Sequence, residues 1–185
     1  MAATVLIRRK TGATGATATD ITSINTRSNA EDAHSTAGTT NPVQVPSSGT
    51  NYSYWTTTRL DVTVTPAGTI DNLRWFSDGT NSLGTGITCV AAKASTGADA
   101  GYRQATGTPG VTGTLLSQGN HSGLDAAVAD VFTFTSASPK TLVGTISNPS
   151  TGQVGDHWVY QFAIATTASP GASSAETFTH RFDET

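Results

Sequence analysis

The chain has 185 residues, 12% of them charged, and its formal net charge at pH 7 is −3. This length fits one domain with room for an extension. The small negative charge argues against binding to nucleic acid, which needs clustered Lys and Arg. No apolar run approaches the ~20 residues of a membrane-spanning helix.

The first fifty residues differ from the rest. Residues 4–8 can pair as a strand, but residues 11–20 are of low complexity and residues 28–51 are mostly small and polar. We expect either a disordered leader or an extended arm that orders on a neighbouring subunit. The scattered apolar residues Ile21, Ile24, Val43 and Val45 favour the arm. The sequence therefore predicts an extended N-terminal arm over residues 1–50 and a folded domain over residues 51–185, and Arg8-Arg9-Lys10 is interpreted as a solvated strand end.

Regular strand patterns begin after residue 51. Alternating or β-prone runs at 58–65, 72–76, 87–92, 100–104, 130–135 and 141–146 predict short strands, and residues 124–129 predict a single helical turn. Turn-forming residues separate these runs, as in Ser77-Asp78-Gly79-Thr80. Many short strands divided by turns predict an all-β fold, either an antiparallel β-sandwich or a jelly roll.

The final 28 residues carry the clearest pattern. In residues 157–165 the large residues Trp158, Tyr160, Phe162 and Ile164 share one face, which predicts a half-buried antiparallel strand. A breaker run at 169–174 precedes a second alternating strand over 176–184, so we expect a closing hairpin. His157 and His180 would face each other if these strands pair, and His157, Gln161 and His180 are expected at the surface.

Signals for chemistry are weak. His34, His121, His157 and His180 lack the spacing of a metal site. The isolated Asp71, Asp78, Asp99 and Asp130 are interpreted as turn formers, and Cys89 as a small apolar strand residue. The sequence predicts no catalytic residue, cofactor or metal site. A pair of glycosidase carboxylates stays open, because sequence spacing does not fix distance.

Aromatic residues offer one candidate contact surface. Trp75 and Trp158 are expected in the core, whereas Tyr52, Tyr54 and Trp55 form a cluster without an evident structural role. We interpret these three residues as a possible exposed contact surface, which in a carbohydrate-binding module would stack on a glycan.

Residues 55–64, residues 70–79 (Ile-Asp-Asn-Leu-Arg-Trp-Phe-Ser-Asp-Gly) and the ending from Gln161 to Glu184 together resemble small β-sandwich virion proteins of tailed bacteriophages. The resemblance covers residues 51–185 and brings no active-site residues. It implies a capsid decoration (cement) protein, with a tail- or fibre-associated protein as the alternative. Its expected partners are the major capsid protein and neighbouring copies of itself in a homo-oligomer. The expected location is the virion, after synthesis in the host cytoplasm without a signal peptide.

Overall fold

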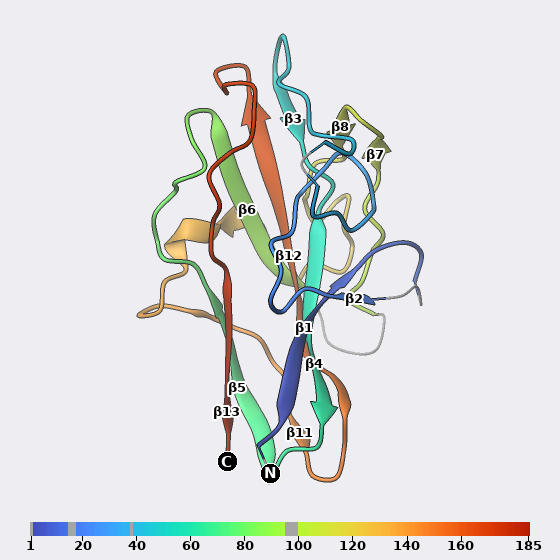
Figure 1. Ribbon diagram of the computed structural model, residues 1–185, viewed down its shortest axis with the longest axis vertical. Coiled ribbons are helices and arrows are strands. Elements are labelled where there is room, and N and C mark those ends of the chain that lie inside the picture. Colours follow the sequence, from blue (N-terminus) through green and yellow to red (C-terminus); the bar gives the residue numbers. More distant parts are fainter. Residues whose placement is uncertain (1, 15–17, 38, 95–99) are drawn as a thin grey trace.

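The computed structural model describes residues 2–14, 18–37, 39–94 and 100–185, and across these ranges two antiparallel sheets face each other (Figure 1). This confirms the predicted all-β, sandwich-like fold. The larger sheet has the order β2-β1-β4-β12-β6-β9, with β3 beside β12. Its strands are β1 (Thr4–Lys10), β2 (Ala18–Asp20), β3 (Thr50–Tyr52), β4 (Thr56–Val64), β6 (Ile87–Ala94), β9 (Ala129–Asp130) and β12 (Gly152–Ala165).

The smaller sheet is built around β5 (Thr69–Phe76). One edge of β5 pairs with β13 (Thr179–Glu184), and the other pairs with the two short strands β10 (Lys140–Thr141) and β11 (Ile146–Ser147). A separate small hairpin joins β7 (Gly107–Thr108) to β8 (Thr112–Gly113). The smaller sheet, built from β5, β10, β11 and β13, therefore covers only part of the larger sheet.

Aromatic side chains fill the space between the two sheets. The Trp75 and Trp158 rings lie 4.5 Å apart between centroids, and Phe134 meets Trp158 edge-on at 5.6 Å. Leu60, Val62 and the rest of this cluster surround the pair. Each buried side chain of this size contributes ~1.5–3 kcal/mol, so the predicted core role of Trp75 and Trp158 is confirmed.

The second face of β12 is also buried. Loops from residues 100–128 cover it, and their Leu116 and Leu124 pack with Val159 of β12 in a second apolar cluster. From Val154 to Gln161 every residue of the strand is buried. The prediction of a half-buried strand with His157 and Gln161 at the surface is therefore wrong, because a third layer of loops replaces solvent.

The two C-terminal strands do not form a hairpin. β12 pairs with β3, β4 and β6 in the larger sheet, whereas β13 pairs with β5 in the smaller one. Residues 166–178 carry the chain from one sheet to the other (Figure 1). His157 and His180 consequently do not face each other, which corrects the predicted pairing.

Four local predictions also fail. Residues 100–104 form a turn and coil. Residues 124–128 form a bridge, bends and coil with no helical turn, and Ala129 begins β9. Residues 131–133 form a 3₁₀ helix capped by Asp130, where a strand was predicted. The predicted strand at 141–146 is split into β10 and β11; between them Gly144 (φ 155°) packs so closely on Gly155 that a Cβ would be 2.4 Å from the Gly155 Cα.

The described part of residues 1–50, namely residues 2–14, 18–37 and 39–50, does not form a free arm. All seven residues of β1 pair with β4. Ala30 and Asn29 are buried, and the Ala30 N–H donates to the Asn41 carbonyl while the Tyr54 N–H donates to that of Asn29. The N-terminal segment that the structure describes is thus part of the same folded body. Across all the described residues, no helix is long and apolar enough to cross a membrane.

Candidate functional site

A cleft of about 1070 Å³ lies over the inner face of the larger sheet, where the smaller sheet no longer covers it. Its base carries Tyr160, Phe162 and Ile164 of β12 and Ile87 of β6. The walls are two coil segments, residues 21–29 with 39–45 on one side and residues 168–178 on the other. β5 ends at Phe76 and β13 begins at Thr179, so coil takes the place of strands here (Figure 1).

The wall at residues 168–178 is coil whose backbone is not paired in a sheet. Ser169-Pro170-Gly171 and the small residues after them do not support a regular strand. From Ser169 to Thr177, no backbone–backbone hydrogen bond joins this wall to another described residue. The Glu176 carboxylate accepts a hydrogen bond from the Ser82 N–H and holds the wall to the loop before β6. Free N–H and C=O groups beside an apolar surface are suited to pairing with an added strand.

His180 stands at the lower end of the cleft. Its Nε2 lies 3.3 Å from Thr58 Oγ1, and its Nδ1 has no hydrogen-bond partner. Burial lowers the pKa of His180 to about 4, so the imidazole is neutral at pH 7. A neutral imidazole without a carboxylate beside it has no group to orient or activate it as a general base.

The lining contains few charges. Among the described lining residues, Arg27 is the one Lys or Arg and Glu176 the one carboxylate. No pair of carboxylates faces this cleft, as glycoside hydrolysis would need. No group of three or more His, Cys, Asp or Glu suited to a metal ion exists across the described ranges. The geometry suits a neutral, apolar chain or ligand.

The predicted contact surface at Tyr52, Tyr54 and Trp55 is not an exposed platform. Tyr54 and Trp55 are 5% and 4% exposed and belong to the second apolar cluster, while Tyr52 is half-buried in β3. The Trp55 Nε1–H donates to the Arg103 carbonyl at 3.1 Å, and its ring meets His121 edge-on. Because the loop layer covers these rings, stacking on a glycan is closed to Tyr54 and Trp55.

The remaining histidines are separate and structural. His121 is fully buried against Trp55, and His157 is buried beside the Tyr102 ring, with centroids 6.4 Å apart. His34 is half-buried, and burial lowers its pKa. The structure does not bring these three side chains or His180 together as ligands of one metal.

Two of the isolated aspartates are turn formers, as predicted. Asp78 Oδ1 accepts from the Thr80 N–H at 2.8 Å, and Asp130 Oδ1 accepts from the Phe132 N–H at 3.0 Å. Asp71 lies on β5 opposite Asp183. Asp99 lies outside the described residues. Cys89 is buried in β6, where burial raises the pKa of its thiol, so its predicted role as a small apolar residue is confirmed.

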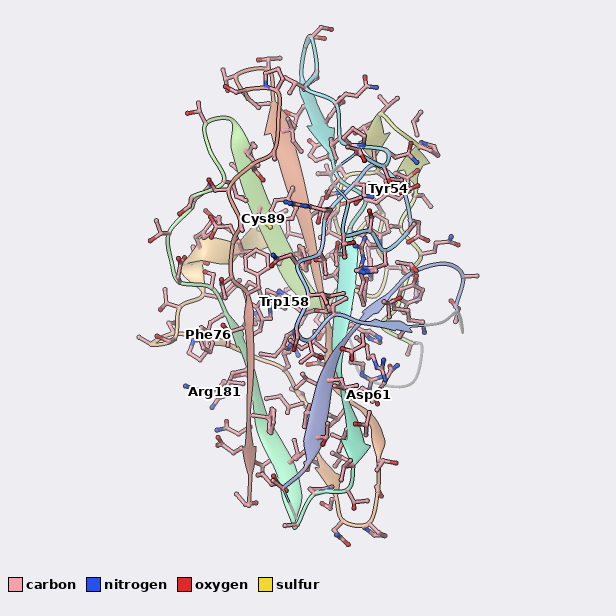
Figure 2. All side chains as sticks on the ribbon, viewed as in Figure 1. Tyr54, Asp61, Phe76, Cys89, Trp158 and Arg181 are labelled. Carbon is pink, nitrogen blue, oxygen red and sulfur yellow. The ribbon has the colours of Figure 1, made fainter. Side chains whose placement is uncertain are left out.

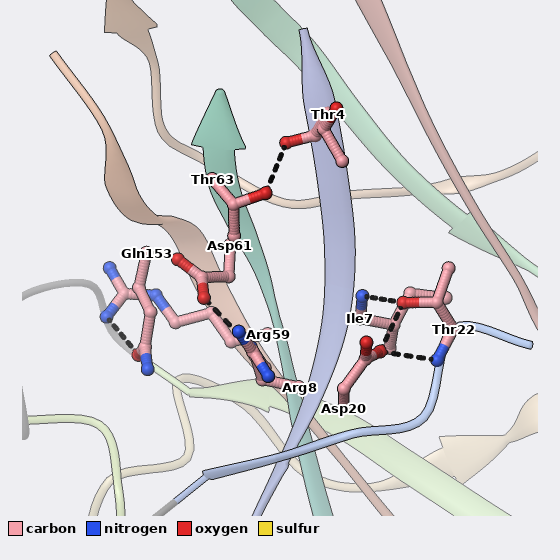
Figure 3. Close-up of polar contacts among 9 residues, drawn as sticks. All are labelled: Thr4, Ile7, Arg8, Asp20, Thr22, Arg59, Asp61, Thr63 and Gln153. Carbon is pink, nitrogen blue, oxygen red and sulfur yellow. Dashed lines mark hydrogen bonds and ion pairs between the residues drawn. The ribbon is translucent and has the colours of Figure 1, made fainter. Parts of the chain in front are cut away.

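The basic cluster is not a solvated strand end. Arg9 is 1% exposed, and its guanidinium donates to the Arg27 carbonyl at 3.0 Å. Arg8 pairs with Asp61 at 2.9 Å on the opposite face of the sheet (Figure 3). Lys10 Nζ lies 4.6 Å from the Tyr102 ring centroid. Because successive side chains alternate across a strand, one basic run supplies charges to both faces of the large sheet.

A second charged cluster was not anticipated from the sequence. Lys93 Nζ lies 3.0 Å from both Asp125 and Asp156, and Asp156 also accepts from the Val143 N–H at 2.7 Å. The Arg59 Nε donates to the Gly155 carbonyl. Its Nη1 reaches the Gln153 side-chain carbonyl (Figure 3). The sequence carries one signal for buried charge here: a charged residue inside an alternating strand pattern, such as Arg59 between Thr58 and Leu60.

No protein-family model, curated protein or solved structure matches the chain.

Proposed function

We propose that this chain is a non-enzymatic structural subunit of a tailed-phage virion, a decoration (cement) protein that binds the capsid surface and stabilises it. The resemblance of residues 51–185 to small virion β-sandwich proteins supports this role. The observation that carries the proposal is the cleft, which offers an apolar, nearly uncharged base beside a wall with an unpaired backbone.

The occupant we propose is an extended segment of the major capsid protein. Its backbone would pair with residues 169–177, and its alternate apolar side chains would cover Phe162 and Ile164 at the base. Such a segment would be uncharged, because among the described lining residues the Arg, Lys, Asp and Glu side chains are limited to Arg27 and Glu176. Binding of this kind stabilises both partners by mass action.

Co-sedimentation with purified shells of the parent phage tests the proposal. Ile24 lines the cleft and is 46% exposed, whereas Val143 is 57% exposed and lies outside it. We expect Ile24→Lys to weaken shell binding by about tenfold or more, because an ammonium would enter an apolar groove. Val143→Lys is the matched control and should bind as the unchanged chain does.

The bound copies per shell separate the head from the tail. Hundreds of copies support decoration of the capsid, whereas a few copies per virion would indicate the tail or fibre instead. Equal binding by Ile24→Lys and the unchanged chain would exclude the cleft as the capsid-binding surface.

A further inference from the structure

The outer strand of the smaller sheet has a self-complementary sequence. β13 and the next residue read Thr179-His180-Arg181-Phe182-Asp183-Glu184-Thr185. Read outward from Phe182, one direction is basic and the other acidic. Two such strands placed antiparallel therefore bring opposite charges together.

One edge of β13 is free. The strand pairs with β5 on one side, and no described strand pairs with its other side. The register shift in this ladder places its extra residue in β5, where Asn72 has a φ of 51°, so β13 itself is regular. Arg181 lies on this strand at the margin of the molecule (Figure 2). A regular, unpaired edge is a template for another strand.

The existing ladder leaves the charges of β13 beside like charges. Arg181 lies opposite Arg74, and Asp183 lies opposite Asp71. Like charges directly opposite each other are destabilising. Arg181 is exposed and makes no ion pair within the described ranges; its guanidinium lies 5.8 Å from the Phe76 ring centroid. Opposite charges on the free edge would compensate both like-charge pairs at once.

We propose that two copies of the chain associate through antiparallel pairing of their β13 strands about a two-fold axis at Phe182. In this register Arg181 of each copy lies opposite Asp183 of the other, and Thr179 lies opposite Thr185. Directly opposite residues share a face of the sheet, so each Arg–Asp pair meets side by side. The two smaller sheets become one continuous sheet, and this pairing does not depend on the proposed virion role.

Sedimentation equilibrium of the purified chain at concentrations up to about 1 mM, the weak end of specific association, tests this pairing. We expect a reversible dimer. Arg181→Asp and Asp183→Arg should each be monomeric, because each places like charges opposite each other across the axis. Each variant also replaces a like-charge pair with β5 by an opposite one, at Arg74 or Asp71, so loss of the fold is not the expected cause.

Mixing the two variants is the decisive measurement. A strand with two acids then meets a strand with two arginines, so a 1:1 heterodimer should form, and the double variant R181D/D183R should dimerise by itself. An unchanged chain that stays monomeric, single variants that still dimerise, or a mixture that does not associate would each overturn the proposal.

A cross-link checks the register without changing any charge. Thr179→Cys and Thr185→Cys lie opposite each other across the axis, so oxidising a mixture of the two variants should give mainly the mixed disulfide. Predominantly same-variant disulfides, or none, would contradict this register. Thermal unfolding of every variant confirms that folded chains are being compared.

Discussion

At the scale of single residues, Gln161 shows how a polar side chain can hold a buried strand. The residue is 1% exposed on β12, and its amide makes three hydrogen bonds of 2.7 Å to backbone groups. Oε1 accepts from the Leu116 N–H, and Nε2 donates to the Ser53 and Thr114 carbonyls. These bonds fix the loop layer to the larger sheet.

Gln161→Leu is expected to destabilise the fold by about 3 kcal/mol or more, because three backbone groups would be buried without partners. The free energy of unfolding, measured with denaturant and Trp fluorescence, checks this value. Gln104→Leu is a control on an exposed glutamine and should change stability by less than ~0.5 kcal/mol. A small effect at Gln161 would mean that water replaces these bonds.

His121 makes the stability depend on pH. It is fully buried, neither ring nitrogen has a hydrogen-bond partner, and burial lowers its pKa from 6.5 to about 4. Below pH 6.5 the unfolded chain binds a proton at this imidazole, whereas the folded chain does not. The contribution of the neutral imidazole to stability is therefore fully present above pH 6.5 and is lost as the pH falls toward 4. His180, with its pKa also near 4, adds to the same loss.

His121→Leu is therefore expected to reduce the loss of stability between pH 7 and pH 4.5, leaving the parts that come from other groups with a lowered pKa, such as His180 and His34. Denaturant midpoints at the two pH values, for the unchanged chain and the variant, measure this difference. The same pH dependence in both chains would show that His121 is not the group that takes up the proton.

At the scale of elements, the bulge in β12 explains why charges lie inside the sandwich. The register with β4 shifts between Val154 and Trp158, and Gly155 there has a φ of 81°. The bulge turns Asp156 toward Lys93 and aims the Gly155 carbonyl at Arg59. A buried carboxylate is tolerated here because a lysine and a backbone N–H both reach it.

The two acids on Lys93 should differ in their effect. Asp156 has a side chain 2% exposed, whereas that of Asp125 is 26% exposed at the same 3.0 Å. Asp156→Ala is expected to cost ~1–3 kcal/mol, because it leaves the Val143 N–H without its acceptor and removes one of the two carboxylates from Lys93. Asp125→Ala, the matched control, should cost ~1 kcal/mol or less. Equal losses in denaturant unfolding would contradict this assignment.

Prediction from sequence succeeded where large apolar and small or polar residues alternate along a strand that packs on the core. It failed where a layer of loops covers the other face of that strand. The alternation around Trp158 predicted β12, but nothing in the pattern of Gln161 or His157 predicts that loops from residues 100–128 will cover them. Tyr54 and Trp55 were misread for the same reason. The cleft could not be predicted, since its walls at residues 21–45 and 168–178 are coil whose position depends on where the smaller sheet ends.

At the scale of the whole molecule, the N-terminal strand closes the sandwich. β1 pairs along β4 and places Ile7 in the cleft lining and Arg9 in the interior. Near its start, the Ala3 N–H donates to the Glu184 carboxylate at the end of β13, so the two sheets meet there. The same carboxylate accepts from the Ala67 N–H, which lowers the pKa of Glu184.

Deleting residues 2–12 should therefore remove a sheet strand and not a dispensable arm. The deletion exposes the edge of β4, uncovers Leu60 and Thr58, and leaves the carbonyl of Arg27 without its guanidinium donor. We expect loss of cooperative thermal unfolding or aggregation, because an exposed apolar edge pairs with other chains. Deleting residues 2–3 is the control; it removes the exposed Ala3 contact with Glu184 but keeps β1, and should leave cooperative unfolding intact with a small change in midpoint. If the chain without residues 2–12 unfolded cooperatively at the unchanged midpoint, β1 would be an arm whose stable position lies on another subunit.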